Sequence, residues 1–153
     1  LEKFKVLTSS DLHHYTKKSL ISDHINNTYK YKLIHTPKQT VYASRPHKYQ
    51  DGYKLFISTT DKYSVFIDNC GMTQSIAFII CENKNQAELY EKILNHKLYV
   101  FLNNICRWGN FNNIRILQNF PKPNLTKYDN DENIIFKYFK LTDDEIEYIK
   151  NNI

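Results

Sequence analysis

The sequence predicts an α+β domain: a mostly antiparallel, twisted sheet packed by one long helix and followed by a small helical tail. Period-two alternation and short β-rich runs occupy residues 29–81, and apolar residues at three- and four-residue steps occupy 86–105. A capping sequence at Thr142 opens a last helix. The length of 153 residues fits one domain that needs no disulfide to maintain its core.

The expected sheet begins at residues 29–35, YKYKLIH, which alternate between the two faces of a half-buried strand. Residues 37–52 contain two prolines and a glycine, so we expect a long loop there, a kind of segment that is often functional. The remaining strand candidates are a short one at 40–43 within that loop, and 53–59, 63–68 and 75–81. Because Ile76 to Ile80 form a continuous apolar run, the last candidate is predicted to be central and buried on both faces.

Three helices are predicted after the sheet. The apolar positions of the long helix over 86–105 are Tyr90, Ile93, Leu94, Leu98, Phe101, Leu102 and Ile105. Two short helices are expected near 131–139 and 143–152. Thr142 and Glu145 have the spacing of a capping box for the last of them, and Leu141 and Ile146 that of a hydrophobic staple.

Charge divides the chain into a basic body and an acidic end. Residues 1–128 contain 18 basic and 9 acidic residues, a balance of +9, whereas residues 129–153 contain 3 and 7, a balance of −4. The polar residues 1–28 predict a linker or short helix joined to a preceding domain, followed by a basic body at 29–128 and an acidic helical tail at 129–153. A basic body favours a polyanionic partner.

Several functional classes lack their sequence signals. The three cysteines form no CxxC pair, which argues against a zinc site or a disulfide scaffold and favours a reducing, cytoplasmic compartment. Neither a dinucleotide-binding nor a Walker glycine motif is present, and the Asn/Asp-Pro-Pro-aromatic motif of amino-methylating enzymes is also absent. We expect no catalytic residue, metal or cofactor in this chain, and no membrane partner.

One catalytic alternative remains open. Asp68, Glu82 and Lys84 follow the Asp…Glu-x-Lys order of many metal-dependent nucleases, in which two carboxylates hold Mg²⁺ and a lysine lies near the attacking water. Asp68 ends one expected strand and Glu82 ends the next. A module that binds another protein is a second alternative.

The candidate DNA contacts come mainly from loops and turns. Arginine, asparagine and glutamine suit base edges, whereas lysine and threonine suit phosphates. The residues selected for these reasons are Lys38, Gln39, Arg45, His47, Lys48, Lys54, Lys62, Tyr63, Asn69, Thr73, Gln74, Arg107, Trp108 and Asn110. We expect Arg45 in the long loop to read guanine and Lys48 to contact a phosphate, with the Asn69–Gln74 loop as the alternative reader.

Residues 106–153 resemble the C-terminus of adenine-N6-specific DNA methyltransferases. The resemblance rests on Phe120-Pro121 followed by Leu125, and on the closing phrase YFKLTDDEIEYI at 138–149; the strand pattern from 29 onward is similar to the preceding target-recognition region. It implies that residues 29–128 are a target-recognition domain for double-stranded DNA in a restriction–modification enzyme of the type IIG kind, whose catalytic domain would precede Leu1. The parent enzyme, bacterial or viral, would bind S-adenosylmethionine, flip an adenine and in some members also cleave DNA. Lys140 departs from the glycine usual in that phrase.

Overall fold

The computed structural model describes residues 1–107, 109 and 111–153 of the protein. Its strands are β1 Ile21–Ser22, β2 Tyr31–Thr36, β3 Gln39–Ala43, β4 Lys54–Ser58, β5 Val65–Asp68, β6 Gly71–Met72 and β7 Ile76–Ile80. Its helices are the 3-10 helix η1 Lys18–Leu20 and the α-helices α1 Lys84–Leu94, α2 Lys97–Ile105, α3 Ile114–Leu117, α4 Glu132–Tyr138 and α5 Asp143–Asn151.

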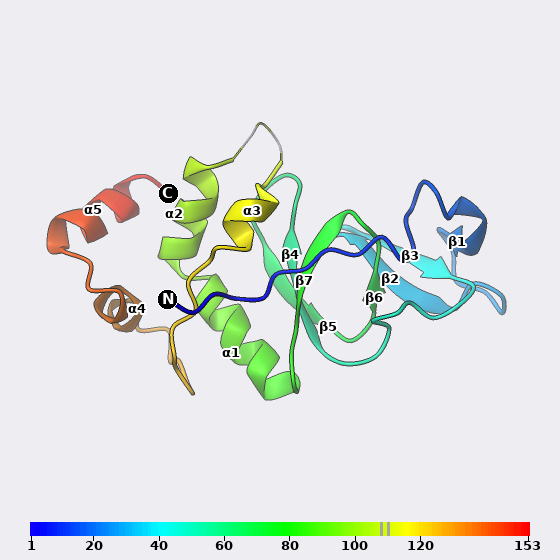
Figure 1. The fold of residues 1–153 in the computed structure, drawn as a ribbon, viewed down its shortest axis with the longest axis horizontal. Coiled ribbons are helices and arrows are strands. Elements are labelled where there is room, and N and C mark those ends of the chain that lie inside the picture. Colours follow the sequence, from blue (N-terminus) through cyan, green and yellow to red (C-terminus); the bar gives the residue numbers. More distant parts are fainter. Residues whose placement is uncertain (108, 110) are drawn as a thin grey trace.

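The predicted α+β class is confirmed, but the strands form two sheets rather than one. The first sheet has the order β1-β3-β2-β6 and the second the order β5-β4-β7. All pairings are antiparallel except the short parallel pairing of β2 with β6. The five α-helices gather at one end of the molecule, next to the second sheet, and the first sheet lies at the other end (Figure 1).

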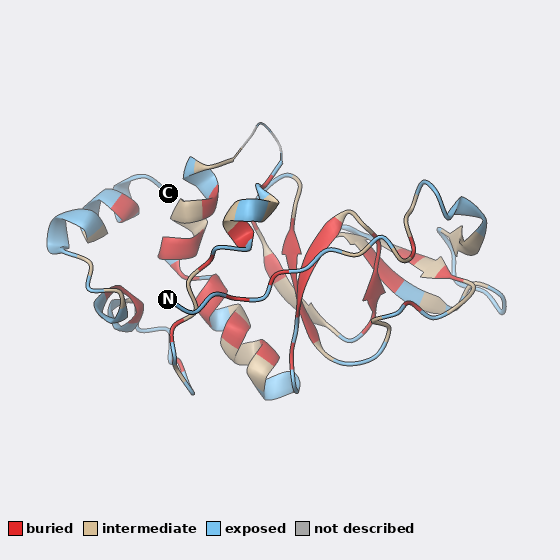
Figure 2. Cartoon of the chain, viewed as in Figure 1, coloured by how far each residue is buried: buried red, intermediate tan, exposed pale blue. Residues whose placement is uncertain are grey.

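Strand β4 is the centre of the second sheet and is buried along its whole length (Figure 2). Leu55 and Ile57 belong to the large apolar cluster that the sheet shares with the helices, whereas Phe56 between them belongs to a cluster shared with the first sheet. Successive side chains of a strand point to opposite faces, so this strand needs apolar residues on both. The prediction that the strand at 75–81 is buried on both faces is confirmed for Ile76–Ile79 of β7. Its predicted central place was wrong, because β4 lies between β5 and β7, and within the described residues the other edge of β7 meets only an isolated bridge between Leu7 and Phe78.

The first sheet shares one of its faces with the second. Ile34 of β2 packs with Phe56 and Met72 between the sheets, and its neighbour Leu33 lies in a separate cluster with Val41 and Leu12. Leu12 is fully buried and lies outside every strand. The first sheet therefore has an apolar outer face, which the N-terminal segment covers.

The N-terminal segment is packed into the domain. The backbone of Leu7 exchanges two hydrogen bonds with Phe78 of β7, with N···O distances of 2.8 and 2.9 Å, and Phe4 N–H donates to Phe120 O at 3.0 Å. The side chains of Phe4 and Val6 are buried in the large cluster. In Figure 1 the segment runs along the molecule from the helical end to the first sheet. The N-terminal segment thus contributes Phe4 and Val6 to the large cluster and Leu12 to the cluster of the first sheet.

The long helix predicted over 86–105 is divided into α1 and α2 at Asn95 and His96. His96 has extended backbone angles (φ −65°, ψ 147°), and its Nδ1 accepts a hydrogen bond from Leu98 N–H at 3.0 Å, so the side chain caps α2. Its Nε2 lies 2.9 Å from Glu132 O, and its ring packs edge-on against Phe136. The apolar spacing continues through the break, which is why periodicity alone did not locate it.

The helical tail follows its predicted signals. Thr142 Oγ1 accepts from Glu145 N–H and Glu145 Oε1 accepts from Thr142 N–H, which confirms the capping box of α5. Lys140 has a φ of 55°, and Leu141 N–H donates to Phe136 O while Lys140 N–H donates to Lys137 O. These bonds form a Schellman ending of α4, whose left-handed position favours glycine. The glycine that Lys140 replaces in the resembled phrase suits this conformation.

Removing the cap of α5 should destabilise the tail. Thr142→Ala is expected to lower the free energy of unfolding by about 1 kcal/mol, because the N–H of Glu145 loses its acceptor. Chemical denaturation followed by circular dichroism measures this change. Thr126→Ala, at an exposed position outside any helix, is the control and should change stability by less than about 0.5 kcal/mol.

The cap at His96 should make stability depend on pH. Burial lowers the pKa of His96 in the folded protein, so the unfolded chain takes up the proton first. The contribution of neutral His96 to the free energy of unfolding is complete above the unfolded pKa of about 6.5 and is lost as the pH falls below that value. His96→Asn retains a capping acceptor that does not titrate, so its unfolding free energy should decrease less between pH 7 and 5 than that of the wild type. Parallel slopes for the two proteins would contradict this role.

Candidate nucleic-acid interface

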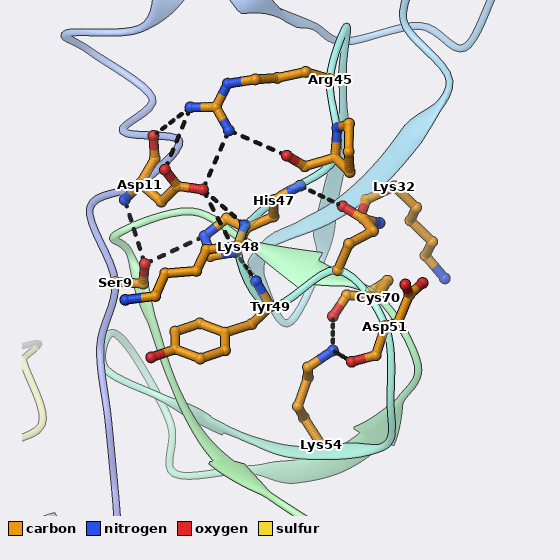
Figure 3. Close-up of polar contacts among 12 residues, drawn as sticks. Ser9, Asp11, Lys32, Arg45, His47, Lys48, Tyr49, Asp51, Lys54 and Cys70 are labelled. Carbon is orange, nitrogen blue, oxygen red and sulfur yellow. Dashed lines mark hydrogen bonds and ion pairs between the residues drawn. The ribbon is translucent and has the colours of Figure 1, made fainter.

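The predicted reader, Arg45, is bound within the protein (Figure 3). Its Nη1 and Nη2 donate to the two carboxylate oxygens of Asp11 at 3.2 and 3.3 Å. Nη2 also donates to Asp11 O at 3.1 Å, and Nη1 to Pro46 O at 3.1 Å. A guanidinium with these partners must give up several charge-assisted hydrogen bonds before it can reach a guanine. Arg45 therefore holds its loop to the N-terminal segment, and these contacts do not favour the expectation that it reads a base.

Asp11 holds the long loop to the N-terminal segment. Burial acts to raise the pKa of this carboxyl, but hydrogen bonds from the Arg45 side chain and the Lys48 N–H outweigh it and lower the pKa below its ordinary value. Lys48 thus uses its backbone to hold the loop, while its ammonium lies 5.3 Å from the centre of the Tyr49 ring. The carboxylate is ionised at neutral pH and accepts the hydrogen bonds from Arg45 and Lys48 that attach the loop.

His47 lies under the same loop and is only 4% exposed. Its Nδ1 accepts from Tyr49 N–H at 2.8 Å, and its Nε2 lies 3.3 Å from Ser9 Oγ. A Cβ on Gly71 would come within 2.7 Å of His47 Cβ, so only glycine lets β6 pass beneath it. Burial lowers the pKa of His47 and favours the neutral ring. His47 packs the loop and is not available to DNA.

Lys54 is also inside the protein, at 1% exposure (Figure 3). Its ammonium donates to the backbone carbonyls of Asp51, Gly52 and Cys70 at 2.9–3.0 Å, which uses all three of its protons. Burial lowers its pKa. This lysine links two loops and cannot contact a phosphate.

Two further candidates are buried. Tyr63 Oη donates to Leu94 O at 2.7 Å and ties the β4–β5 loop to the end of α1, and burial raises the pKa of its phenol. Thr73 is fully buried, with its Oγ1 2.7 Å from His35 Nδ1. Together with Arg45, His47 and Lys54, these residues account for five of the predicted DNA contacts that serve the fold instead.

Other candidates converge on one edge of the molecule. The turn between β2 and β3 and the loop between β4 and β5 line a shared hollow of about 260 Å³. Its lining residues are Thr36, Pro37, Lys38, Thr60, Asp61, Lys62 and Ser64. Lys38 and Lys62, which are 24 positions apart in the sequence, thus face one hollow, and both are exposed. Gln39 begins β3 directly after Lys38 and is exposed as well.

Two more segments join this edge. Thr59 Oγ1 donates to Ser75 O at 2.7 Å, which brings Gln74 next to the β4–β5 loop. On the other side, Thr60 forms a backbone bridge with Phe111, and Asn112 N–H donates to Thr59 O at 2.9 Å. We call the surface formed by residues 36–39, 59–64, 73–75 and Phe111 the turn edge. Its segments come from both sheets and from the connection between α2 and α3.

A β-bulge shapes the turn edge from below. Ile34 pairs with Thr40 and Thr36 with Gln39, which leaves His35 as an extra residue in β2. Bulges re-aim side chains and are common beside functional sites. The His35 ring stacks on His14 at a centroid distance of 4.2 Å, and His14 N–H donates to Gln74 Oε1 at 2.8 Å. The Gln74 side chain therefore holds the N-terminal segment, which makes it a poor reader of bases.

The connection after α2 is only partly described. Trp108 and Asn110, both predicted contacts, lie outside the described residues. Arg107 is half-buried, and its Nε has no hydrogen-bond partner among the residues that the structure describes. Asn112 is buried and donates to Ser58 O at 2.7 Å, so the return of this connection is tied to the end of β4.

The residues of the nuclease alternative lie at the opposite end of β4 from the turn edge. Asp68 pairs with Lys54 across one side of β4, and Ile80, two residues before Glu82, pairs with it across the other. The backbones at Asp68 and Ile80 are thus two strand spacings apart, roughly 9.6 Å. Lys32 Nζ binds Asp68 Oδ2 at 2.8 Å, and the exposed Asn69 lies beside this pair. Over residues 1–107, 109 and 111–153, no group of three or more His, Cys, Asp or Glu side chains could hold a metal ion.

Searches against protein-family models, curated proteins and solved structures find no match for this chain. Sequence reasoning selected Lys38, Gln39, Lys62 and Gln74 but missed Asp61 and Phe111 at the same edge. The sequence signal that could have indicated Asp61 is the Thr-Asp-Lys turn between two strands, since aspartate in a turn tolerates left-handed backbone.

Arg45 and Asp11 should be coupled in stability. Each of Arg45→Ala and Asp11→Asn is expected to destabilise the protein, and a double-mutant cycle should give a coupling of about 1 kcal/mol, reduced by the partial exposure of the pair. The coupling should disappear as the pH falls from about 5 through the lowered pKa of Asp11, because the carboxylate is then protonated. Additive effects at pH 7 would show that the pair does not hold the loop.

Proposed function

We propose that this domain binds double-stranded DNA through the turn edge. The observation that carries the proposal is the convergence of Lys38 and Lys62 on one hollow, from two turns that belong to different sheets. No side-chain ion pair involves either ammonium within the described parts of the chain. Lysines held on short turns of a rigid scaffold suit the phosphates of a duplex, which they contact as point charges.

The charge of the chain supports the same partner. The basic balance of +9 lies in residues 1–128, and the acidic helices α4 and α5 lie at the helical end of the molecule, away from the first sheet (Figure 1). Phosphate contacts release counterions, so the affinity should decrease steeply with salt. Exposed Gln39 next to Lys38 adds a side chain able to bond a base edge.

We further propose that the domain serves target recognition in a larger adenine-specific DNA methyltransferase of a restriction–modification system. The closing phrase at 138–149 supports this role, since α4 and α5 use the glycine-favouring turn and the capping box that such a phrase encodes. S-adenosylmethionine and the flipped adenine would then belong to a catalytic domain of the same parent chain, in the cytoplasm of a bacterial or virus-infected cell. No helix in the described ranges is long and apolar enough to cross a membrane.

The separation of Asp68 from Glu82 by β4 does not favour the nuclease alternative, and Asp68 is already paired with Lys32. A protein-binding module makes a distinct prediction: it requires no affinity for duplex DNA. Titration of a labelled duplex at low salt distinguishes the two functions directly. A flat titration up to roughly 100 μM, the range of non-specific binding, would contradict the proposal.

Single lysine substitutions test where DNA binds. Lys38→Ala and Lys62→Ala should each weaken binding at low salt and reduce the slope of log affinity against log salt by about one, because each removes one phosphate contact. Lys92→Ala on α1 is the matched control, since it removes the same charge from an exposed lysine away from the hollow. Fluorescence anisotropy at several salt concentrations measures the slopes. Equal slopes for all three variants would show that only net charge matters.

A further inference from the structure

The tip of the β4–β5 loop presents a carboxylate at the same hollow as the two lysines of the turn edge. Asp61 lines the same hollow as Lys38 and Lys62 and is exposed. Among the described residues, its side chain takes part in none of the hydrogen bonds or ion pairs found. A carboxylate at a phosphate-binding surface repels DNA unless it meets a hydrogen-bond donor there. Phosphate binding alone therefore does not explain a carboxylate at this position.

The backbone at Asp61 has a defined conformation. Asp61 has a φ of 56°, a left-handed conformation that aspartate and asparagine tolerate better than other residues with a side chain. The base of the loop is fastened by fully buried Ser58, whose Oγ donates to Lys62 O and accepts from Ser64 N–H, both at 2.9 Å. Asn112 and the Thr59–Ser75 bond brace it from either side. These bonds hold the backbone on both sides of Asp61 and so set the point from which its side chain leaves the loop.

We propose that Asp61 reads the exposed amino group of a cytosine in the major groove; this inference rests on the proposed DNA-binding function. An ionised carboxylate only accepts hydrogen bonds, so it is repelled by the O6 and N7 acceptors of guanine and the O4 acceptor of thymine. Adenine offers its N6 amino group between two acceptors, its own N7 and the O4 of the paired thymine, whereas the N4 amino group of cytosine has an acceptor on one side only, the O6 of the paired guanine. Lys38 and Lys62 would bind phosphates on either side of that base pair.

The test is selection of bound duplexes from a randomised pool, with the wild-type chain and two variants that keep the left-handed turn. Asparagine and glycine both adopt a φ near 56°, so Asp61→Asn and Asp61→Gly should fold as the wild type does, which thermal unfolding verifies. The wild type should enrich cytosine at one position, with a preference of about 5- to 150-fold over the other bases in titrations of single-site duplexes.

The two variants should then differ at that position alone. Asp61→Asn should move the preference from cytosine to adenine, since an amide bonds N6 and N7 together, and Asp61→Gly should remove the preference. An increase in affinity for all duplexes alike, with the cytosine preference unchanged or absent from the start, would overturn the reading role and leave the DNA-binding function intact. A wild-type chain that binds no duplex at all would overturn both.

Discussion

The buried ammonium of Lys54 is the contact on which the arrangement of the two sheets depends. It extends from the first residue of β4 and binds the carbonyls of Asp51 and Gly52, which end the long loop, and of Cys70, which precedes β6. One side chain thus joins the second sheet to the connection that enters the first. A buried charge is costly unless its hydrogen bonds are satisfied, and here three carbonyl dipoles satisfy all of its donors. Cys70, one of these three acceptors, directly precedes Gly71, whose backbone passes close to His47.

The two faces of β4 explain why the turn edge is rigid. Leu55 and Ile57 anchor the strand to the helices, and Phe56 anchors it to the first sheet. The loop that leaves its far end is therefore fastened on both sides, through Asn112 toward α3 and through Ser75 toward β7. A protruding turn on a base of this kind loses little conformational freedom on binding, which is what a recognition element requires.

The candidate interface is the turn edge and not the long basic loop, because Arg45 of that loop is paired with Asp11. Asp11 lies 34 positions before Arg45 in the sequence, yet its carboxylate binds the guanidinium and the Lys48 N–H together. Loop length, prolines and basic residues all pointed to this loop as the reader. The same features also suit a loop that folds back onto an acidic partner, and only the position of that partner separates the two cases.

Local patterns in the sequence predicted the α+β class, the positions of the main strands, the capping box at Thr142 and the two short helices of the tail. Each depends on residues a few positions apart, so the necessary information is contiguous. The break at His96 escaped because the apolar spacing continues through it, and His96, which caps α2, also contacts Glu132, 36 residues away. In the candidate site, burial of Lys54, Tyr63 and Thr73 and the pairing of Arg45 could not be seen in advance. Whether a polar side chain faces solvent or a distant acceptor is decided by which segments pack together, and that choice is made only in the tertiary structure.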